Sequence, residues 1–229
     1  MRWRELLGPA AENVRAVLFD AVGTLITPTT SVAEVYFDFG QRRGSRLETK
    51  EIAARFPAAL RAAEVCQGRS DERIELDRWR AVVRHVFDDL PETEPLFREL
   101  WAHFAEPHSW RLVPRAVELL EGLIAENYLV GVASNFDARL RTVLSGPNRV
   151  PAAVNLFISS DLGWQKPHTG YFRGVERALG LSPQELLLIG DDWDNDVCGG
   201  RSAGWQTIWV APTTSADSPS VASLAELCD

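Results

Sequence analysis

The sequence predicts an α/β protein, in which a doubly wound parallel sheet of the Rossmann-like type carries an inserted α-helical domain. Short apolar, β-rich runs alternate with helical segments over the second half of the chain, as in a parallel sheet covered by helices. A similar run stands near the start. Between the two regions, from about Ser31 to Glu106, helical periodicity replaces the strand-like runs. We therefore predict a core domain of residues 1–28 and 108–229 and a helical cap domain of residues 29–107.

The first strand is predicted at residues 14–19, an apolar run that ends at Asp20 and is followed by a turn at Gly23. Later strands are predicted at residues 129–133, 154–158, 186–189 and 206–210. Helices are predicted to start at Pro114, to run over residues 167–179, to lie around Val197 and to run over residues 221–227, with a polar loop at residues 213–219.

In the helical region, Thr49 is a plausible cap for one helix, since its hydroxyl can accept a hydrogen bond from a free backbone N–H group. Apolar residues fall at helical spacing in two further segments: Leu76, Trp79, Val83, Val86 and Phe87, then Leu96, Leu100 and Phe104. Several amphipathic helices in a row predict a bundle. We expect the large aromatic residues Trp79, Trp101 and Trp110 to form its core rather than a ligand site.

The composition of the chain disfavours several classes of function. The chain has 229 residues, a net charge of −8 and a pI of about 5.1, so its surface repels phosphate backbones and nucleic-acid binding is disfavoured. Cys66, Cys198 and Cys228 lie far apart, which indicates neither a zinc site nor a disulfide framework. Residues 1–15 are not typical of a signal peptide and no run is typical of a membrane span, so a cytoplasmic location is expected. No pattern indicates an oligomeric state.

Three apolar strands end directly in polar residues: Asp20, Ser134 and Asp191. Ligands of open parallel sheets bind outside the carboxyl ends of the strands, so the sequence places a site there. Asp196 adds a further carboxylate, and the acids would repel one another without a cation. Mg²⁺ suits such a site because it binds carboxylates, waters and substrate phosphate. Asp194, by contrast, is expected to be a helix cap or a loop residue.

Lys166 is one of only two lysines among 24 basic residues, the other being Lys50 at a predicted helix start. Its ammonium could bind a phosphate and hold the Asp20 carboxylate ionised. Ser134 and Asn135, at the end of a neighbouring strand, could cap a helix or donate hydrogen bonds to phosphate oxygens.

Four segments together resemble the haloacid dehalogenase-like hydrolases that carry a helical cap after the first strand (subfamily I). They are Phe19-Asp20-Ala21-Val22-Gly23-Thr24-Leu25, Val132-Ala133-Ser134-Asn135, Lys166-Pro167 with Tyr171-Phe172, and Ile189-Gly190-Asp191-Asp192 with Asp196. The resemblance covers nearly the whole chain and rests on the order of the segments at strand ends.

The resemblance implies hydrolysis of a phosphate ester or acyl phosphate through an aspartyl-phosphate on Asp20. It implies that Ser134 and Lys166 are catalytic and that Gly23, Thr24 and Asn135 bind substrate. Mg²⁺ would be held by Asp20, the backbone carbonyl of Val22, Asp191 and Asp196. The expected partner is a small phosphorylated or halogenated metabolite.

The chain departs from the resemblance at Val22. Phosphatases of this family usually carry a second Asp there, which protonates the leaving oxygen, and general acid–base help contributes about 10² to 10⁴ in rate. A 2-haloacid dehalogenase-type hydrolase and a catalytically degenerate protein that binds a phosphorylated ligand therefore remain as alternatives. Dehalogenases do not need the acidic pair of Asp191 and Asp196, which favours phosphate chemistry.

Overall fold

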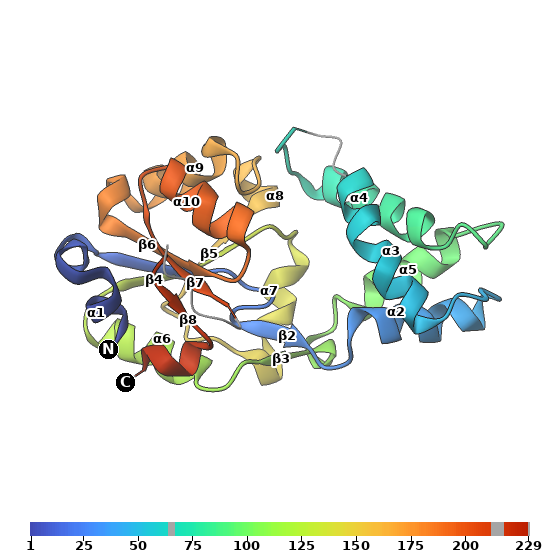
Figure 1. The fold of residues 1–229 in the computed structure, drawn as a ribbon, viewed down its shortest axis with the longest axis horizontal. Helices are drawn as coiled ribbons and strands as arrows, with labels where there is room; N and C mark the ends of the chain where they lie inside the picture. Colours follow the sequence, from blue (N-terminus) through green and yellow to red (C-terminus); the bar gives the residue numbers. More distant parts are fainter. Residues whose placement is uncertain (64–66, 212–217, 229) are drawn as a thin grey trace.

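The computed structural model describes residues 1–63, 67–211 and 218–228. Figure 1 shows a core lobe, which contains both termini, and a smaller helical lobe beside it. The core is built on a six-stranded sheet of order β5-β4-β1-β6-β7-β8, in which every neighbouring pair is parallel. Its strands are β1 (Ala16–Phe19), β4 (Leu129–Ser134), β5 (Asn155–Ile158), β6 (Leu186–Gly190), β7 (Gln206–Val210) and β8 (Ser220–Val221).

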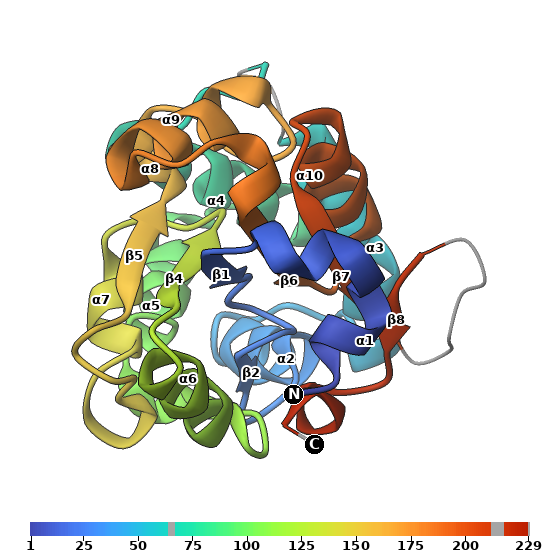
Figure 2. The same ribbon diagram turned by 90° about the vertical axis from the view of Figure 1, so that its left-hand side faces the viewer.

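The sheet is covered on both faces, because alternate residues of each strand point to opposite sides. In β1, Val17 and Phe19 belong to one apolar cluster and Ala16 and Leu18 to another, and all four are buried. Figure 2 shows α8, α9 and α10 along one face of the sheet and α6 along the other. This confirms the predicted doubly wound sheet. The helices of the core are α1 (Trp3–Leu7), α6 (Ala116–Ala125), α7 (Arg139–Val143), α8 (Ser159–Leu162), α9 (Thr169–Leu179) and α10 (Gly199–Ser202).

The helical lobe is joined to the core by a two-stranded antiparallel ribbon, β2 (Ile26–Pro28) with β3 (Trp110–Leu112), which the sequence did not predict. Both strands are three residues long. The lobe contains α2 (Val32–Arg42), α3 (Thr49–Ala62), α4 (Glu72–Val86) and α5 (Glu94–His103). In α4 and α5 the apolar stripe is confirmed, since Val83, Val86, Leu96 and Leu100 are all buried in one cluster.

Several helix ends differ from the prediction. Thr49 is the first residue of α3 rather than its cap, and Glu48 holds the capping position. Pro114 stands outside α6, because Arg115 adopts a left-handed conformation before the helix begins. Residues 220–221 join the sheet as β8, so only residues 224–227 turn helically. The predicted polar loop at residues 213–219 and Cys66 fall mostly or wholly outside the described residues.

The tryptophans correct another expectation. Trp79 and Trp101 do pack against the apolar core of the helical lobe, but Trp110 lies in β3 and belongs to the core-domain cluster. All three also line a cavity between the two lobes. Over the described parts of the chain, no helix is both long enough and apolar enough to cross a bilayer.

Candidate active site

The predicted strand ends meet at one edge of the sheet. Asp20 follows β1, Ser134 ends β4 and Asp191 follows β6, and these three strands are neighbours in the sheet. Phe19 pairs in register with Val132 on one side and with Ile189 on the other. The chain therefore delivers the three residues side by side, although they lie far apart in sequence.

Lys166 connects two of the acids. Its Nζ donates hydrogen bonds to Asp20 Oδ1 at 2.8 Å, to Asp196 Oδ1 at 2.5 Å and to the carbonyl of Ala133 at 2.7 Å. The side chains of Lys166 and Asp196 are each 1% exposed, and that of Asp20 is 13% exposed. All three donors of the ammonium are thus used within the protein. Lys166 can stabilise the charge of Asp20 and orient its carboxylate. In this geometry no N–H of the ammonium is left to donate a hydrogen bond to a phosphate.

Asn135 fixes the backbone of this lysine. Its Nδ2 donates to the carbonyl of Lys166 at 2.9 Å, and its Oδ1 accepts from the Lys166 N–H at 2.7 Å. We predicted Asn135 to bind substrate. In the structure both the oxygen and the nitrogen of the Asn135 amide bond to the Lys166 backbone. Asn135 therefore positions the loop that carries the ammonium.

Asp191 is held from the opposite side. The Thr24 hydroxyl, on a side chain that is buried, donates to Asp191 Oδ1 at 2.8 Å. Gly23 has a φ of +95°, and a Cβ at this position would fall on the Asp191 carboxylate. Thr24 and Gly23, both predicted to bind substrate, therefore shape the position of this carboxylate: Thr24 by donating to it and Gly23 by leaving room for it.

Asp196 is placed by a helix that starts just after β6. Residues 193–198 form one π-helical turn, and Asp192 caps it by accepting hydrogen bonds from the N–H groups of Asp194 and Asn195. Gly190 leaves space for Asp196, since a Cβ there would fall on its carboxylate. Asp194 is exposed, and no hydrogen bond of its side chain to another described residue is found. Asp196 thus belongs to the site, while Asp192 acts as a helix cap.

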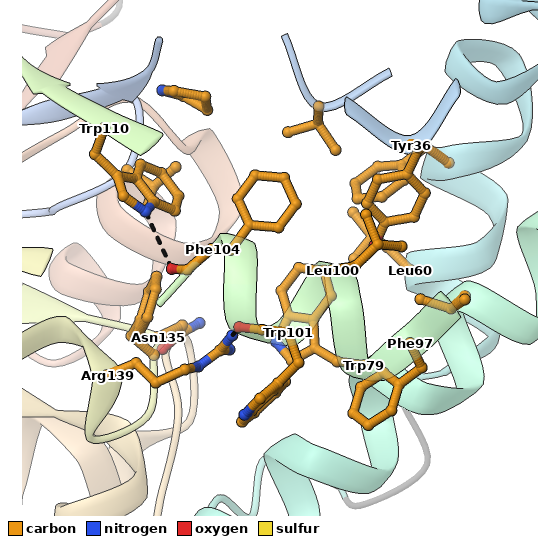
Figure 3. A pocket seen from close by; sticks show the side chains of 16 residues that line it. Tyr36, Leu60, Trp79, Phe97, Leu100, Trp101, Phe104, Trp110, Asn135 and Arg139 are labelled. Carbon is orange, nitrogen blue, oxygen red and sulfur yellow. Dashed lines mark hydrogen bonds between the residues drawn. The ribbon is translucent and has the colours of Figure 1, made fainter. Parts of the chain in front are cut away.

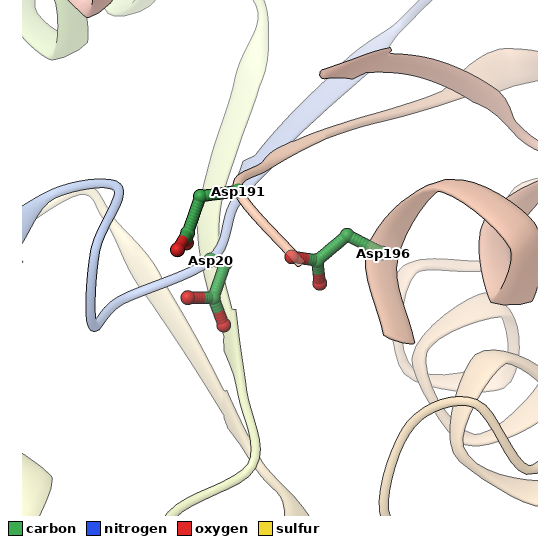
Figure 4. A group of neighbouring side chains, drawn as sticks. All are labelled: Asp20, Asp191 and Asp196. Carbon is green, nitrogen blue, oxygen red and sulfur yellow. The ribbon is translucent and has the colours of Figure 1, made fainter. Parts of the chain in front are cut away.

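The three carboxylates fit a divalent cation. Asp20, Asp191 and Asp196 each offer an oxygen within 4.8 Å of the others, and Figure 4 shows Asp20 and Asp191 side by side with Asp196 turned toward them. Against these three negative charges stands one ammonium, so two charges stay uncompensated when all four groups are ionised. The pKa of Asp20 is raised to about 7, chiefly by burial; Lys166 opposes this increase, and the nearby Asp196 and Asp191 carboxylates add to it. Burial also raises the pKa of Asp191, against the hydrogen bond from Thr24. A divalent cation would remove both the repulsion and the burial penalty.

Replacing Gly23 by Ala is expected to disturb this carboxylate array. The added Cβ must displace Asp191, and the positive φ adds strain of about 1 to 3 kcal/mol. We expect a lower free energy of unfolding in urea and a weaker affinity for Mg²⁺ in titration calorimetry. Gly44→Ala is the matched control, because Gly44 also has a positive φ but a Cβ there meets nothing within 4 Å. An unchanged Mg²⁺ affinity in Gly23→Ala, or an equal loss in Gly44→Ala, would contradict the role assigned to Gly23.

Ser134 and Val22 complete the predicted residues. Ser134 is 2% exposed, and no hydrogen bond of its hydroxyl to another described residue is found, so this hydroxyl is available for a ligand. Val22 is 38% exposed, which is unusual for a large apolar residue of this chain. It lies two residues beyond Asp20, where its bridge to Ile26 closes the turn after β1.

A buried ion pair that the sequence did not predict lies beside these residues. Arg139 donates from Nε and Nη2 to the two carboxylate oxygens of Asp137 at 2.8 and 2.7 Å, and from Nη1 to the carbonyl of Trp101 at 3.1 Å. The guanidinium also lies 3.3 Å from the centroid of the Trp101 ring. Figure 3 shows Arg139 reaching from the core toward Trp101 of the helical lobe. Asp137 and Arg139 follow closely after the Ser134-Asn135 segment, and this position is the one hint that the sequence offers. Neither residue falls in a periodic apolar pattern, so the sequence does not indicate that the pair is buried.

Taken together, these features define an α/β protein that has a carboxylate–lysine site at the carboxyl edge of a doubly wound sheet and carries an inserted helical lobe. Residues 14–204 match the model of the haloacid dehalogenase-like hydrolases, and the chain belongs to this family.

Among curated proteins, the chain is similar to haloacid dehalogenase-like hydrolase domain-containing protein 3 of Xenopus laevis. The two are 26% identical over 88% of this chain and 86% of the relative. Among solved structures, the HAD-hydrolase YfnB from Bacillus subtilis, determined bound to magnesium, matches with a TM-score of 0.73 and 21% identity over 93% of this chain and 96% of the other. A dehalogenase with an intermediate complex matches with a TM-score of 0.72 and 19% identity over 94% and 96%. At these identities the structural matches support the fold.

Proposed function

We propose that this protein is a Mg²⁺-dependent hydrolase that cleaves a small phosphate ester or acyl phosphate through an aspartyl-phosphate on Asp20. The observation that carries the proposal is the placement of Asp191. Its carboxylate lies beside Asp20 but receives no bond from Lys166, and Thr24 and Gly23 hold it there. A carbon-directed nucleophile gains nothing from a second, uncompensated carboxylate, whereas a metal site requires one.

The chain's own residues have distinct tasks in this reaction. Asp20 attacks phosphorus with one carboxylate oxygen, and the bond from phosphorus to the substrate's leaving oxygen breaks; that oxygen departs with the electron pair and takes a proton from water. Lys166 keeps the Asp20 carboxylate ionised and fixed in orientation. Ser134 donates its hydroxyl to a phosphate oxygen. Asp191 and Asp196, with Asp20 and the Val22 carbonyl, would hold Mg²⁺, which when bound supplies positive charge that screens the phosphate from the carboxylates. Water then attacks phosphorus, which regenerates Asp20 and releases inorganic phosphate.

We propose residues 29–107 as the cap that covers this chemistry, and a small phosphorylated metabolite as the substrate. The lining of the cavity between the lobes comes from both parts of the chain, including Tyr36 from α2 and Phe136 from the core. A lid of this kind excludes water and adds specificity contacts. A cytoplasmic location stays a prediction.

The proposal is tested by the metal dependence of hydrolysis. Acetyl phosphate and p-nitrophenyl phosphate have good leaving groups, so turnover should not need a general acid. With Mg²⁺ we expect release of inorganic phosphate, and with excess EDTA a loss of about 10²-fold or more, because charge screening by a metal contributes several kcal/mol. Mg²⁺ should also raise the melting temperature, since it binds only the folded site. Metal-independent turnover, or no stabilisation by Mg²⁺, would rule out the proposed mechanism.

The Val22→Asp variant tests the missing acid. We expect kcat/KM for an alkyl phosphate, which has a poor leaving group, to rise by about 10²-fold or more, because a carboxyl group at this position can protonate the leaving oxygen. Acetyl phosphate should gain much less. Val22→Thr is the control, since it keeps the shape of valine without supplying an acid. Equal rates for all three proteins would mean that protonation of the leaving group does not limit the reaction.

A 2-haloacid dehalogenase remains a second candidate because Val22 puts an apolar side chain where phosphatases carry an acid. Asp20 would then attack carbon and displace halide without metal. Chloride release from 2-chloropropionate in the presence of EDTA, with no hydrolysis of any phosphate, would favour this reaction. Phosphate binding without turnover of either substrate class would indicate a degenerate, ligand-binding member.

A further inference from the structure

The cavity between the two lobes has a volume of about 280 Å³ and is lined in part by residues that adjoin the reacting groups. Val22, two residues beyond Asp20, and Asn135, which fixes Lys166, are among its lining residues. Figure 3 shows side chains of the helical lobe and of the core facing one another across it. A group attached to a phosphate that reacts at Asp20 would therefore extend into this cavity.

The lining is aromatic and apolar. It includes Tyr36, Phe56, Trp79, Phe97, Trp101 and Phe104. Arg139 is the one described lining residue with a formal charge, and its guanidinium is already paired with both oxygens of Asp137, which is fully buried. An ionic or sugar-like substrate group would find few polar partners in this lining, and each polar atom left without a partner costs free energy to bury.

We propose that the substrate is an aryl phosphate whose uncharged aromatic group, about the size of two fused rings, fills this cavity. The proposal rests on the proposed function, which supplies the phosphoryl chemistry. An engineered cavity of about 150 Å³ accommodates benzene, so a cavity of about 280 Å³ accommodates a larger ring system. Flat rings packed on aromatic side chains gain stabilisation from edge-to-face and offset contacts.

An aryl leaving group also explains why a valine, Val22, can stand at the position where phosphatases of this family usually carry an aspartate. A phenol has a pKa of about 10, well below that of water, so an aryloxide leaves phosphorus with far less need of protonation. In the step, the Asp20 oxygen–phosphorus bond forms as the bond from phosphorus to the aryl oxygen breaks. The electron pair leaves on the aryl oxygen, which takes a proton from water. Val22 thus stands in place of an acid that this substrate does not need, and it extends the apolar lining of the cavity toward the leaving oxygen.

The test compares 2-naphthyl phosphate with phenyl phosphate, which have leaving groups of similar acidity but different apolar size. With Mg²⁺ we expect a kcat/KM ratio of about 10 or more in favour of the naphthyl ester, within the range that differences in apolar contact confer. Leu60 lines the cavity from α3, and Leu60→Gln should bring this ratio close to one. Ala58→Gln, an exposed position on the same helix, should leave the ratio unchanged. A ratio near one in the unmodified protein, with turnover of both esters, would overturn the proposal.

A binding measurement separates this proposal from the proposed function. 2-Naphthol needs neither the metal nor the nucleophile, and we expect it to bind, to quench tryptophan emission, and to bind more weakly to Leu60→Gln than to Ala58→Gln. Binding of naphthol without hydrolysis of any phosphate, acetyl phosphate included, would support the aryl site and reject the hydrolase. Hydrolysis of acetyl phosphate without naphthol binding would reject the aryl site and keep the hydrolase.

Discussion

Asp20→Asn is expected to lower turnover of every phosphate substrate by about 10⁴-fold or more, the scale seen when a nucleophile is removed. The amide oxygen can still accept the hydrogen bond from Lys166, so the packing should survive. An amide cannot form the acyl phosphate, however, and it also withdraws one negative charge from the carboxylate array. The loss should appear in kcat with a folded protein.

The measurement combines steady-state phosphate release with intact-mass analysis after acid quenching. The unmodified protein should carry an adduct of one phosphoryl group during turnover, and Asp20→Asn should carry none. Asp194→Asn makes the same chemical change at an exposed residue of the π-helical turn after β6 and should retain full activity. Substantial turnover by Asp20→Asn, or an adduct on it, would show that Asp20 is not the nucleophile.

The sequence predicted that the candidate site residues at the strand ends lie close together, because the sheet alone determines their positions. Asp20, Ser134 and Asp191 each end an apolar strand, and parallel strands bring their carboxyl ends to one edge, so convergence followed from local pattern alone. The scarcity of lysine added Lys166, because a lysine kept in a chain that otherwise uses arginine marks a position where a compact ammonium matters.

The sequence did not reveal how these groups are held. The Thr24 hydroxyl reaches across 167 positions to Asp191, and the Asn135 amide reaches across 31 positions to the Lys166 backbone. Such contacts leave no periodicity or spacing in the sequence, so both residues were assigned to the substrate instead. The cavity was missed for a similar reason. Its aromatic residues fall at helical spacing, which is equally typical of a helix core, and only the packing of two lobes leaves a space between them.

Lys166→Met is expected to be the most destabilising single change at this site. It preserves a long, unbranched side chain but removes the ammonium between Asp20 and Asp196, and the Asp196 side chain is only 1% exposed. Removing one partner of a buried ion pair typically costs about 3 to 5 kcal/mol, because the remaining charge is left without compensation. The free energy of unfolding in urea measures this loss. Lys50→Met, at the other lysine, which is exposed on α3, should change it by less than about 0.5 kcal/mol.

The double variant Lys166→Met/Asp196→Asn distinguishes electrostatics from packing. If the loss arises from an unpaired buried carboxylate, neutralising Asp196 should recover part of the stability, and the two substitutions should not be additive. A purely additive result would mean that Lys166 stabilises the fold through packing and through its bond to the Ala133 carbonyl. Activity should stay low in the double variant in either case. The reason is that Asp20 would still lack the ammonium that keeps it ionised. Stability that recovers while activity does not would separate the contribution of Lys166 to folding from its contribution to the nucleophile.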